Sequence, residues 1–155
     1  MNFIEIQTVH QASNLPDEQQ IQGWVEAALQ NHPSDTEIVV RIVDEQESAE
    51  LNQQYRHKSG PTNILSFPVD LPEGIVLDLL GDLVICAPVL EKEAIEQQKV
   101  LADHWAHIII HGVLHLLGYD HIEEDDATIM QTLEIKLLAE LGLDNPYQDE
   151  DNKIE

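Results

Sequence analysis

The chain has only one cysteine and begins without a long apolar run, and these shortages argue against several classes of protein. One of its 155 residues is a cysteine, Cys86, so an internal disulfide is impossible and a reducing compartment is favoured. A lone thiol in an apolar segment is more often part of a core than a nucleophile. The N-terminal residues lack both a basic region and a long apolar stretch, which argues against a signal peptide or a membrane span. We therefore expect a cytoplasmic protein that does not associate with membranes.

Basic residues are also scarce. The chain has 7 lysines and arginines against 30 aspartates and glutamates, and its formal net charge is −23. A charge of this sign and size opposes non-specific binding to nucleic acids and to anionic membranes. The few basic residues are partly clustered, because Arg56, His57 and Lys58 are adjacent, and a bound divalent ion would add two positive charges. Any binding of a nucleic acid is thus expected to be weak, salt-sensitive or assisted by a partner.

The hydrophobic pattern predicts one α/β domain, and a chain of this length can bury a core without a metal. Alternating or β-branched apolar residues predict strands at about residues 2–10, 37–43, 64–67 and 79–86. Apolar residues at helical spacing, with capping and proline signals, predict helices at about residues 16–32, 44–55, 88–98, 101–117 and 125–142. We expect a mixed sheet of about four strands with about five helices packed on it, within residues 1–142. Residues 143–155 are expected to form an acidic, frayed tail.

The last of these helices is expected to be capped by Asp125 and Asp126, because aspartate accepts hydrogen bonds from the first helical turn. Metal ligation is the alternative role for these acids and for Glu123 and Glu124. The apolar stripe of the helix is predicted to consist of Ile129, Met130, Leu133, Leu137 and Leu141.

Residues 111–121, HGVLHLLGYDH, form the most specific pattern in the chain. His111 and His115 are four residues apart in a predicted helix, so their side chains lie one turn apart on the same face. Gly118 follows where the helix would end, and glycine adopts the left-handed conformation found there without steric cost. The resulting chain reversal allows His121 to return to the same point. Three imidazoles at this spacing predict one tetrahedral site for zinc or a similar divalent ion, with a position open for water.

Other residues near this pattern are candidates for supporting roles. His104 and His107 continue the stripe of His111 and His115 along the predicted helix. We expect His107 to be either a proton carrier or partner near the metal, or a partly buried residue bonded to a carbonyl. His104 is expected at the exposed end of the helix. Asp120 either orients an imidazole, takes a proton from water, or only forms the turn.

An ion with an open coordination position polarises a carbonyl or phosphoryl oxygen and suits hydrolysis of amides or phosphodiesters. A guanidinium serves phosphoryl transfer, and the chain has two arginines, Arg41 and Arg56. Arg41 lies within a predicted strand and is interpreted as structural. Arg56 lies at the end of a predicted helix, where the alternative role is that of a surface residue favoured by the helix dipole.

The histidine spacing matches that of the metzincin proteases, with one departure. Metzincins have a glutamate general base directly after the first histidine, where this chain has Gly112. A peptide hydrolase with this sequence would need a base from elsewhere.

The same residues resemble the signature of the YbeY family of bacterial metal-dependent endoribonucleases. The resemblance extends to residues 62–68 (TNILSFP) and 81–85 (GDLVI) and to the length, so it covers nearly the whole chain. It implies a single α/β domain, a zinc-like ion on His111, His115 and His121, and cleavage of single-stranded RNA. Asn63 departs from the expected Asp, and this change keeps the turn hydrogen bond but removes charge and basicity.

The resemblance also implies roles in maturation of ribosomal RNA, at the 3′ end of 16S rRNA, and in ribosome quality control. The implied partners are single-stranded rRNA and the small ribosomal subunit or its proteins, with no role for DNA. Arg56, with Lys58 nearby, matches the basic position of the family beside the metal cleft. The leading hypothesis is an endoribonuclease in which zinc, or another divalent transition metal, activates water or polarises the phosphate for attack by the ribose 2′-OH. Arg56 and His115 are then the catalytic residues, and Arg56 and Lys58 bind substrate.

Two other functions stay open at this point. One is a metalloprotease or amide hydrolase with metzincin-like histidine spacing. The other is a non-catalytic ribosome-binding module in which the metal is structural, since an acidic chain docks more readily on a basic ribosomal protein than on RNA alone.

Overall fold

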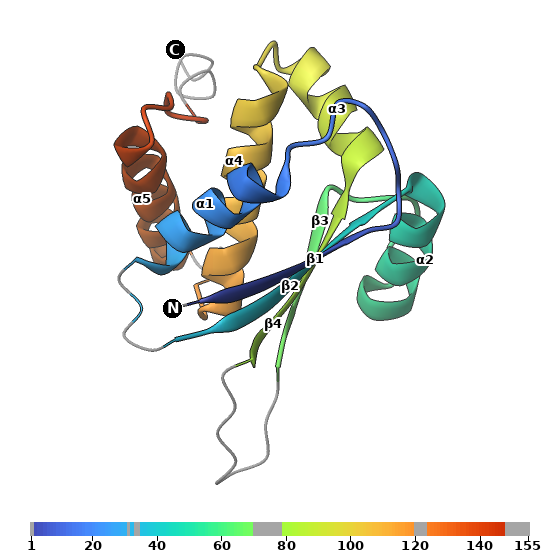
Figure 1. Ribbon diagram of the computed structural model, residues 1–155, viewed down its shortest axis with the longest axis horizontal. Helices are drawn as coiled ribbons and strands as arrows, with labels where there is room; N and C mark the ends of the chain where they lie inside the picture. The colour runs from blue at the N-terminus through green and yellow to red at the C-terminus, as the bar shows by residue number, and fades with distance from the viewer. Residues whose placement is uncertain (1, 31, 33–34, 70–78, 120–123, 148–155) are drawn as a thin grey trace, which may run out of the picture.

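The computed structural model describes residues 2–30, 32, 35–69, 79–119 and 124–147, which form one sheet and the helices around it (Figure 1). The strands are β1 (Phe3–Thr8), β2 (Glu37–Val43), β3 (Ile64–Pro68) and β4 (Leu79–Cys86). The helices are α1 (Glu18–Leu29), α2 (Glu45–Arg56), α3 (Ala87–Glu96), α4 (Leu101–Leu116) and α5 (Glu124–Glu140). The predicted fold class, a mixed sheet of about four strands with about five helices, is confirmed.

The strand order in the sheet is β1-β2-β4-β3. β1, β2 and β4 are parallel, whereas β3 runs antiparallel to β4 and forms an edge of the sheet. Helices α1, α4 and α5 lie on one side of the sheet and α2 lies on the other (Figure 1). The larger core cluster fills the first side, and a smaller one, built on Val43, Leu65, Val84 and Cys86, fills the second. Cys86 is therefore a core residue, as predicted.

Local signals explain where the first helices begin. The side chain of Asp17 accepts a hydrogen bond from the backbone N–H of Gln20, and the side chain of Gln20 accepts one from the backbone N–H of Asp17. This capping box satisfies backbone donors that the first turn of α1 leaves without helical partners. Asp44 caps α2 by accepting from the N–H of Glu47 at 2.9 Å. Helix α2 starts where its sequence signal predicted, whereas α1 starts at Glu18, so Pro16 precedes the cap instead of lying in the first turn.

The expectation for His104 is wrong, because this side chain is buried and only 2% exposed. Helix α3 packs beside the first turns of α4, and Glu93 of α3 contacts His104 through Oε1 and Nε2 at 2.9 Å. A residue that would be exposed at the end of an isolated helix is thus covered by its neighbour.

The expectations for α5 need two corrections. The helix begins at Glu124, so Asp125 and Asp126 lie within the first turn and act on the helix dipole instead of capping the helix. Ile129 and Leu141 are 56% and 41% exposed, so they do not face the core. The residues of α5 that are buried are Met130, Glu134, Leu137 and Leu138, with Leu133 partly buried. The buried face is therefore rotated from the predicted stripe and includes a carboxylate.

The segment after α5 packs against the rest of the domain. Leu143 contacts the core, and Lys99 donates a hydrogen bond to the carbonyl of Pro146 at 3.2 Å. Residues 148–155 lie outside the described part of the chain. The domain boundary at residue 142 and the frayed tail beyond it stay predictions.

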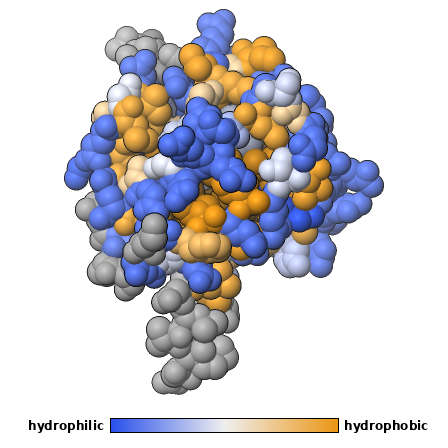
Figure 2. All heavy atoms as spheres, in the orientation of Figure 1, coloured by the Kyte–Doolittle hydropathy of each residue, from blue (hydrophilic) through white to orange (hydrophobic). Residues whose placement is uncertain are grey.

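The outer surface is mixed in character. In the view of Figure 2, hydrophilic residues cover much of the face and apolar residues show between them. No described helix combines the length and the apolar character that crossing a bilayer requires.

Helix α4 approaches the sheet closely at Gly112. A Cβ atom at this position would lie 2.5 Å from Cδ1 of Ile64 and 2.9 Å from Cδ2 of Leu83. These two side chains belong to β3 and β4, so a larger residue at position 112 would force their ends, or α4 itself, to move.

We expect Gly112→Ala to lower the free energy of unfolding by about 1–2 kcal/mol, because overpacking outweighs the gain in helix propensity. Gly23→Ala is the matched control, since Gly23 lies within α1 and a Cβ there meets nothing within 4 Å. That change is expected to stabilise the protein by about 0.5–1 kcal/mol. Urea unfolding of both variants provides the measurement, and equal stabilisation by the two substitutions would contradict the packing argument.

Candidate functional site

A cleft of about 820 Å³ lies alongside the edge strand β3, between the C-terminal ends of α2 and α4. It is lined by Tyr55, Arg56, residues 62–68, His111, His115, Gly118 and Tyr119. None of these lining residues is acidic, although the chain as a whole carries a net charge of −23. The cleft thus brings two histidines and a guanidinium together, and the carboxylates near it lie behind its lining residues.

His111 and His115 point their rings toward one another in this cleft, as their spacing on a helix predicts. The Nε2 atoms of the two rings are 3.1 Å apart. Nδ1 of His115 lies 3.0 Å from the carbonyl oxygen of Tyr119, so it carries the hydrogen and donates it. Nδ1 of His111 contacts the carboxylate of Glu134 and likewise donates. In the neutral rings each Nε2 therefore carries a lone pair.

This arrangement fits a divalent metal ion. Two nitrogen lone pairs at 3.1 Å repel each other, whereas one cation ligated by both atoms removes the repulsion. Two zinc–nitrogen bonds of about 2.0–2.1 Å at a tetrahedral angle place the nitrogens only slightly farther apart than this. Imidazole nitrogen is also a ligand type that zinc prefers.

Behind His111, on the side away from His115, lies a buried cluster of hydrogen-bonding groups. Glu134 of α5 is fully buried, and its Oε1 accepts from Nδ1 of His111 while its Oε2 accepts from the hydroxyl of Tyr147. Nε2 of His107 lies 3.4 Å from Oε2 of Glu134 and 3.3 Å from the Tyr147 hydroxyl. His107 is thus partly buried beside this carboxylate, which fits the role of a partner to the site better than a bond to a carbonyl.

The cluster shifts the pKa values of its members. Burial opposes ionisation of Glu134, but hydrogen bonds from His107, His111 and Tyr147 outweigh it and lower the pKa of this carboxyl to about 2. Burial also lowers the pKa of His107, against the raising effect of Glu134. At neutral pH Glu134 is therefore charged and His107 is neutral.

His107, His111 and Glu134 also form a second set of possible metal ligands, because their ligand atoms all lie within 4.8 Å of one another. His111 belongs to both sets, through Nδ1 on the side of Glu134 and through Nε2 on the side of His115. The two sets differ in which nitrogen of His111 would bind an ion.

The other predicted site residues differ in how closely they approach the histidines. Arg56 is exposed at the last position of α2 and lines the same cleft as His111 and His115. Lys58 is exposed but is not among the lining residues. His121, Asp120 and Glu123 lie outside the described residues. Arg41 binds Glu47, with Nε 2.6 Å from Oε2, which agrees with its structural interpretation.

Asn63 has a specific partner that explains its side chain. Its Nδ2 donates to both carboxylate oxygens of Glu93, at 3.3 and 3.2 Å, and its Oδ1 accepts from the N–H of Ile64 at 2.7 Å. An aspartate at this position would place a second negative charge against Glu93. The amide is therefore the side chain that this particular neighbour favours.

Glu134, Tyr147 and Glu93 are site residues that the sequence reasoning missed. Glu134 is the carboxylate within the apolar face of α5, and its position between Met130 and Leu138 at helical spacing was the one available signal. Tyr147 and Glu93 gave no local signal, because their contacts cross between distant segments.

Comparisons with known proteins agree with one another. The family model described as endoribonuclease YbeY matches residues 5–142. A protein named endoribonuclease YbeY from Pseudomonas putida (strain W619) is 56% identical over 138 residues, covering 88% of each chain. Another of the same name from Methylococcus capsulatus (strain ATCC 33009 / NCIMB 11132 / Bath) is 57% identical over 137 residues, covering 88% of this chain and 90% of the relative.

Among solved structures, the solution structure of TM1509 from Thermotoga maritima superposes with a TM-score of 0.59 at 26% identity, covering 90% of this chain and 91% of that one. The relatives confirm the resemblance drawn from the histidine pattern and, at the level of the family, the prediction of a hydrolytic endoribonuclease. The chain therefore belongs to the endoribonuclease YbeY family.

Proposed function

We propose that this protein is a metal-dependent endoribonuclease for single-stranded RNA, with one zinc ion, or another divalent transition metal ion, held by His111, His115 and His121. The observation that carries the proposal is the approach of the Nε2 atoms of His111 and His115 to 3.1 Å in a cleft that Arg56 also lines. Family membership supports the reaction class, because the matching relatives are named endoribonucleases. When bound, the ion would supply Lewis acidity toward a phosphoryl oxygen or a water molecule.

Arg56 is proposed to bind the scissile phosphate. Its guanidinium is always charged and presents several N–H donors in one plane, which matches the oxygens of a phosphate whose negative charge increases during cleavage. Lys58, exposed two residues further on, is proposed to contact the RNA backbone outside the cleft. His115 is proposed to hold its position through the hydrogen bond to the carbonyl of Tyr119.

Aromatic residues in the cleft support single-stranded RNA as the substrate. The ring of Tyr55 packs edge-on against that of Phe67, with centroids 5.0 Å apart, and both residues line the cleft. Tyr55 is 56% exposed, and Tyr119, on the other side of the cleft, is 37% exposed. Exposed rings stack with bases that are not already stacked in a duplex. Stacking also provides affinity that does not depend on positive charge, which this chain has little of.

The biological substrate is proposed to be ribosomal RNA, with processing near the 3′ end of 16S rRNA and a part in ribosome quality control in the cytoplasm. The strongly acidic surface supports assistance by a partner such as a basic protein of the small ribosomal subunit. Cleavage of rRNA within the small subunit should then exceed cleavage of the same RNA alone.

The metal requirement gives a direct prediction. Elemental analysis of the purified protein should find one zinc or related ion per chain, and a chelator should abolish cleavage of a single-stranded RNA. His115→Ala should remove cleavage in a protein that still folds, because the domain has a core that does not need the ion. Undiminished cleavage by metal-free protein would contradict the proposal, as would turnover of an unstructured peptide in place of RNA. Product ends carrying a 2′,3′-cyclic phosphate would identify the ribose 2′-OH as the nucleophile, and their absence would identify water.

The role of Arg56 is tested by a pair of substitutions with the same change in net charge. Arg56→Ala should lower kcat by about 10²–10³-fold, the cost of removing one donor to a developing oxyanion. Lys92→Ala is the control, because Lys92 is an exposed residue paired with Glu45 and does not line the cleft. Its kcat should equal that of the unmodified protein, and equal losses in the two variants would show that Arg56 acts only through overall charge.

The stacking role of Tyr55 predicts a loss of binding affinity without a change in fold. Tyr55→Ala should weaken binding of a single-stranded oligonucleotide by about 1–3 kcal/mol, with a smaller effect from Tyr55→Phe, which keeps the ring. Fluorescence anisotropy with a labelled oligonucleotide measures both variants. Equal affinity of Tyr55→Ala and the unmodified protein would rule out stacking at this residue.

A further inference from the structure

We propose that Glu134 is a positioning residue for His111 and that Tyr147 holds Glu134 in place. By accepting the Nδ1 hydrogen of His111, the carboxylate leaves Nε2 as the ligating atom and directs it toward His115. This inference rests on the proposed function, because it concerns the same metal site. The candidate ligands lie within residues 111–121. The inference gives α5 and the segment after it the role of holding one of these ligands in place.

The first step of the argument is the burial of the carboxylate. Glu134 is fully buried, and a buried carboxylate is costly unless its oxygens accept hydrogen bonds. Oε1 accepts from His111, and Oε2 accepts from Tyr147 with His107 alongside at 3.4 Å. The donors thus come from α4 and from the segment that follows α5, so they fix both the position and the rotation of the carboxylate.

The second step concerns the ring of His111. A neutral imidazole has its hydrogen on either Nδ1 or Nε2, and the partner of one nitrogen decides which. An ionised carboxylate can only accept, so its contact with Nδ1 selects the form with the hydrogen on Nδ1. Carboxylates that accept from a metal-binding imidazole orient the ring and raise its basicity.

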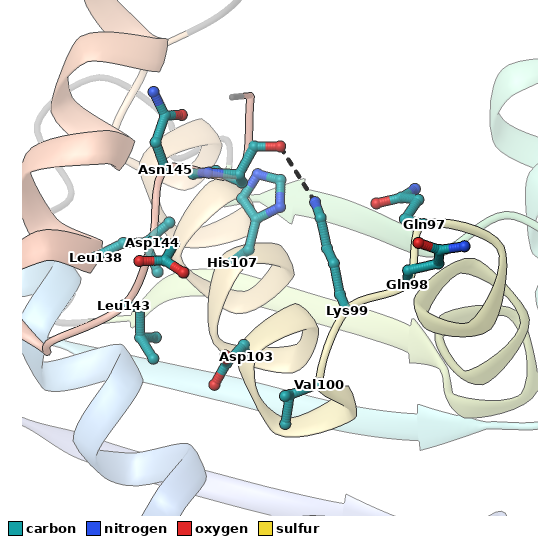
Figure 3. Close-up of a pocket in the computed structure, with 11 residues that line it drawn as sticks. Gln97, Gln98, Lys99, Val100, Asp103, His107, Leu138, Leu143, Asp144 and Asn145 are labelled. Atoms are coloured by element: carbon teal, nitrogen blue, oxygen red, sulfur yellow. Dashed lines mark hydrogen bonds between the residues drawn. The ribbon is translucent and has the colours of Figure 1, made fainter. Parts of the chain in front are cut away.

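The third step is how Tyr147 reaches Glu134. Residues after α5 line a pocket together with His107 and Lys99 (Figure 3). Lys99 donates to the carbonyl of Pro146 at 3.2 Å, and the N–H of Tyr147 donates to the side chain of Asn145 at 2.8 Å. These bonds on either side of the peptide between Pro146 and Tyr147 place the tyrosine hydroxyl against Oε2.

The alternative is that Glu134 is itself a ligand, together with His107 and His111. Both carboxylate oxygens already accept hydrogen bonds, Oε1 from Nδ1 of His111 and Oε2 from the hydroxyl of Tyr147. A supporting role accounts for all of these contacts, whereas a ligand role requires them to break.

A carboxylate away from the cleft provides the control. Glu45 of α2 pairs with Lys92 of α3 at 3.2 Å, and neither residue lines the cleft. Removing the charge of Glu45 should therefore leave the metal site unchanged.

The experiment is a titration of the metal-free full-length chain with Zn²⁺ against a competing chromophoric chelator. Glu134→Ala should bind zinc about 10–100-fold more weakly than the unmodified chain, the usual effect of removing such a partner. Glu134→Gln should recover most of the affinity, because its amide oxygen can still accept from Nδ1. Tyr147→Phe should give a smaller loss than Glu134→Ala, and Glu45→Gln should give none.

A second measurement does not depend on bound metal. Ring ¹⁵N NMR spectra of the metal-free chain should show the hydrogen of His111 on Nδ1, and in Glu134→Ala they should show a mixture of the two forms. If Glu134→Ala does not fold, the same spectra of Glu134→Gln and Tyr147→Phe test whether Glu134 and Tyr147 control the position of the His111 hydrogen.

The outcomes separate this inference from the proposed function. Unchanged zinc affinity in Glu134→Ala, with loss of binding in His111→Ala and His115→Ala, would overturn the positioning role alone. Unchanged affinity in His111→Ala and His115→Ala would overturn the proposed metal site itself. Two zinc ions per chain, of which Glu134→Gln loses one, would show that Glu134 is a ligand and overturn the inference.

Discussion

The close packing of α4 against the sheet at Gly112 is the constraint on which the site depends. Because position 112 has no side chain, Ile64 of β3 and Leu83 of β4 reach the helix directly. The hydroxyl of Ser66 donates to the carbonyl of Gly112 at 3.3 Å, which ties the edge strand to the helix at the same turn. His111 directly precedes Gly112, and His115 follows it by about one helical turn. The packing of Gly112 against the core therefore sets the position of both histidines beside β3. The metzincin glutamate has no counterpart here for the same reason, since this position faces the sheet.

Features encoded by neighbouring residues could be predicted from the sequence, and features encoded by contacts between distant segments could not. The four strands, the cap at Asp44, and the shared face of His111 and His115 all follow from spacings of a few residues. The burial of His104 depends on α3. The same distinction applies to α5. The helical spacing of apolar residues favoured Ile129 as a core residue, whereas the structure buries Glu134, whose hydrogen-bond donors are far away in the sequence.

The charge of the chain and the composition of its cleft have to be considered together. A net charge of −23 makes long-range attraction of RNA unfavourable, and salt screens this repulsion beyond about 10 Å. Within the cleft, the described lining residues include no carboxylate, while the nearest buried one, Glu134, is directed away behind His111. Glu134 is fully buried, and hydrogen bonds from His107, His111 and Tyr147 stabilise its charge. The proposed recognition through Arg56 and exposed rings is thus compatible with a net charge that opposes non-specific binding of nucleic acids.

The four histidines of α4 show how one helix face is divided between structure and chemistry. His104 is held by Glu93 of α3, and His107 lies beside Glu134 and Tyr147. His111 and His115 alone among these four line the cleft, each with Nδ1 engaged by an acceptor. An imidazole whose Nδ1 hydrogen is fixed in this way presents its other nitrogen in one direction. The acceptors, a side chain of α5 and a carbonyl just beyond α4, therefore decide where the two Nε2 atoms meet, and the spacing of the histidines brings the rings within reach of each other.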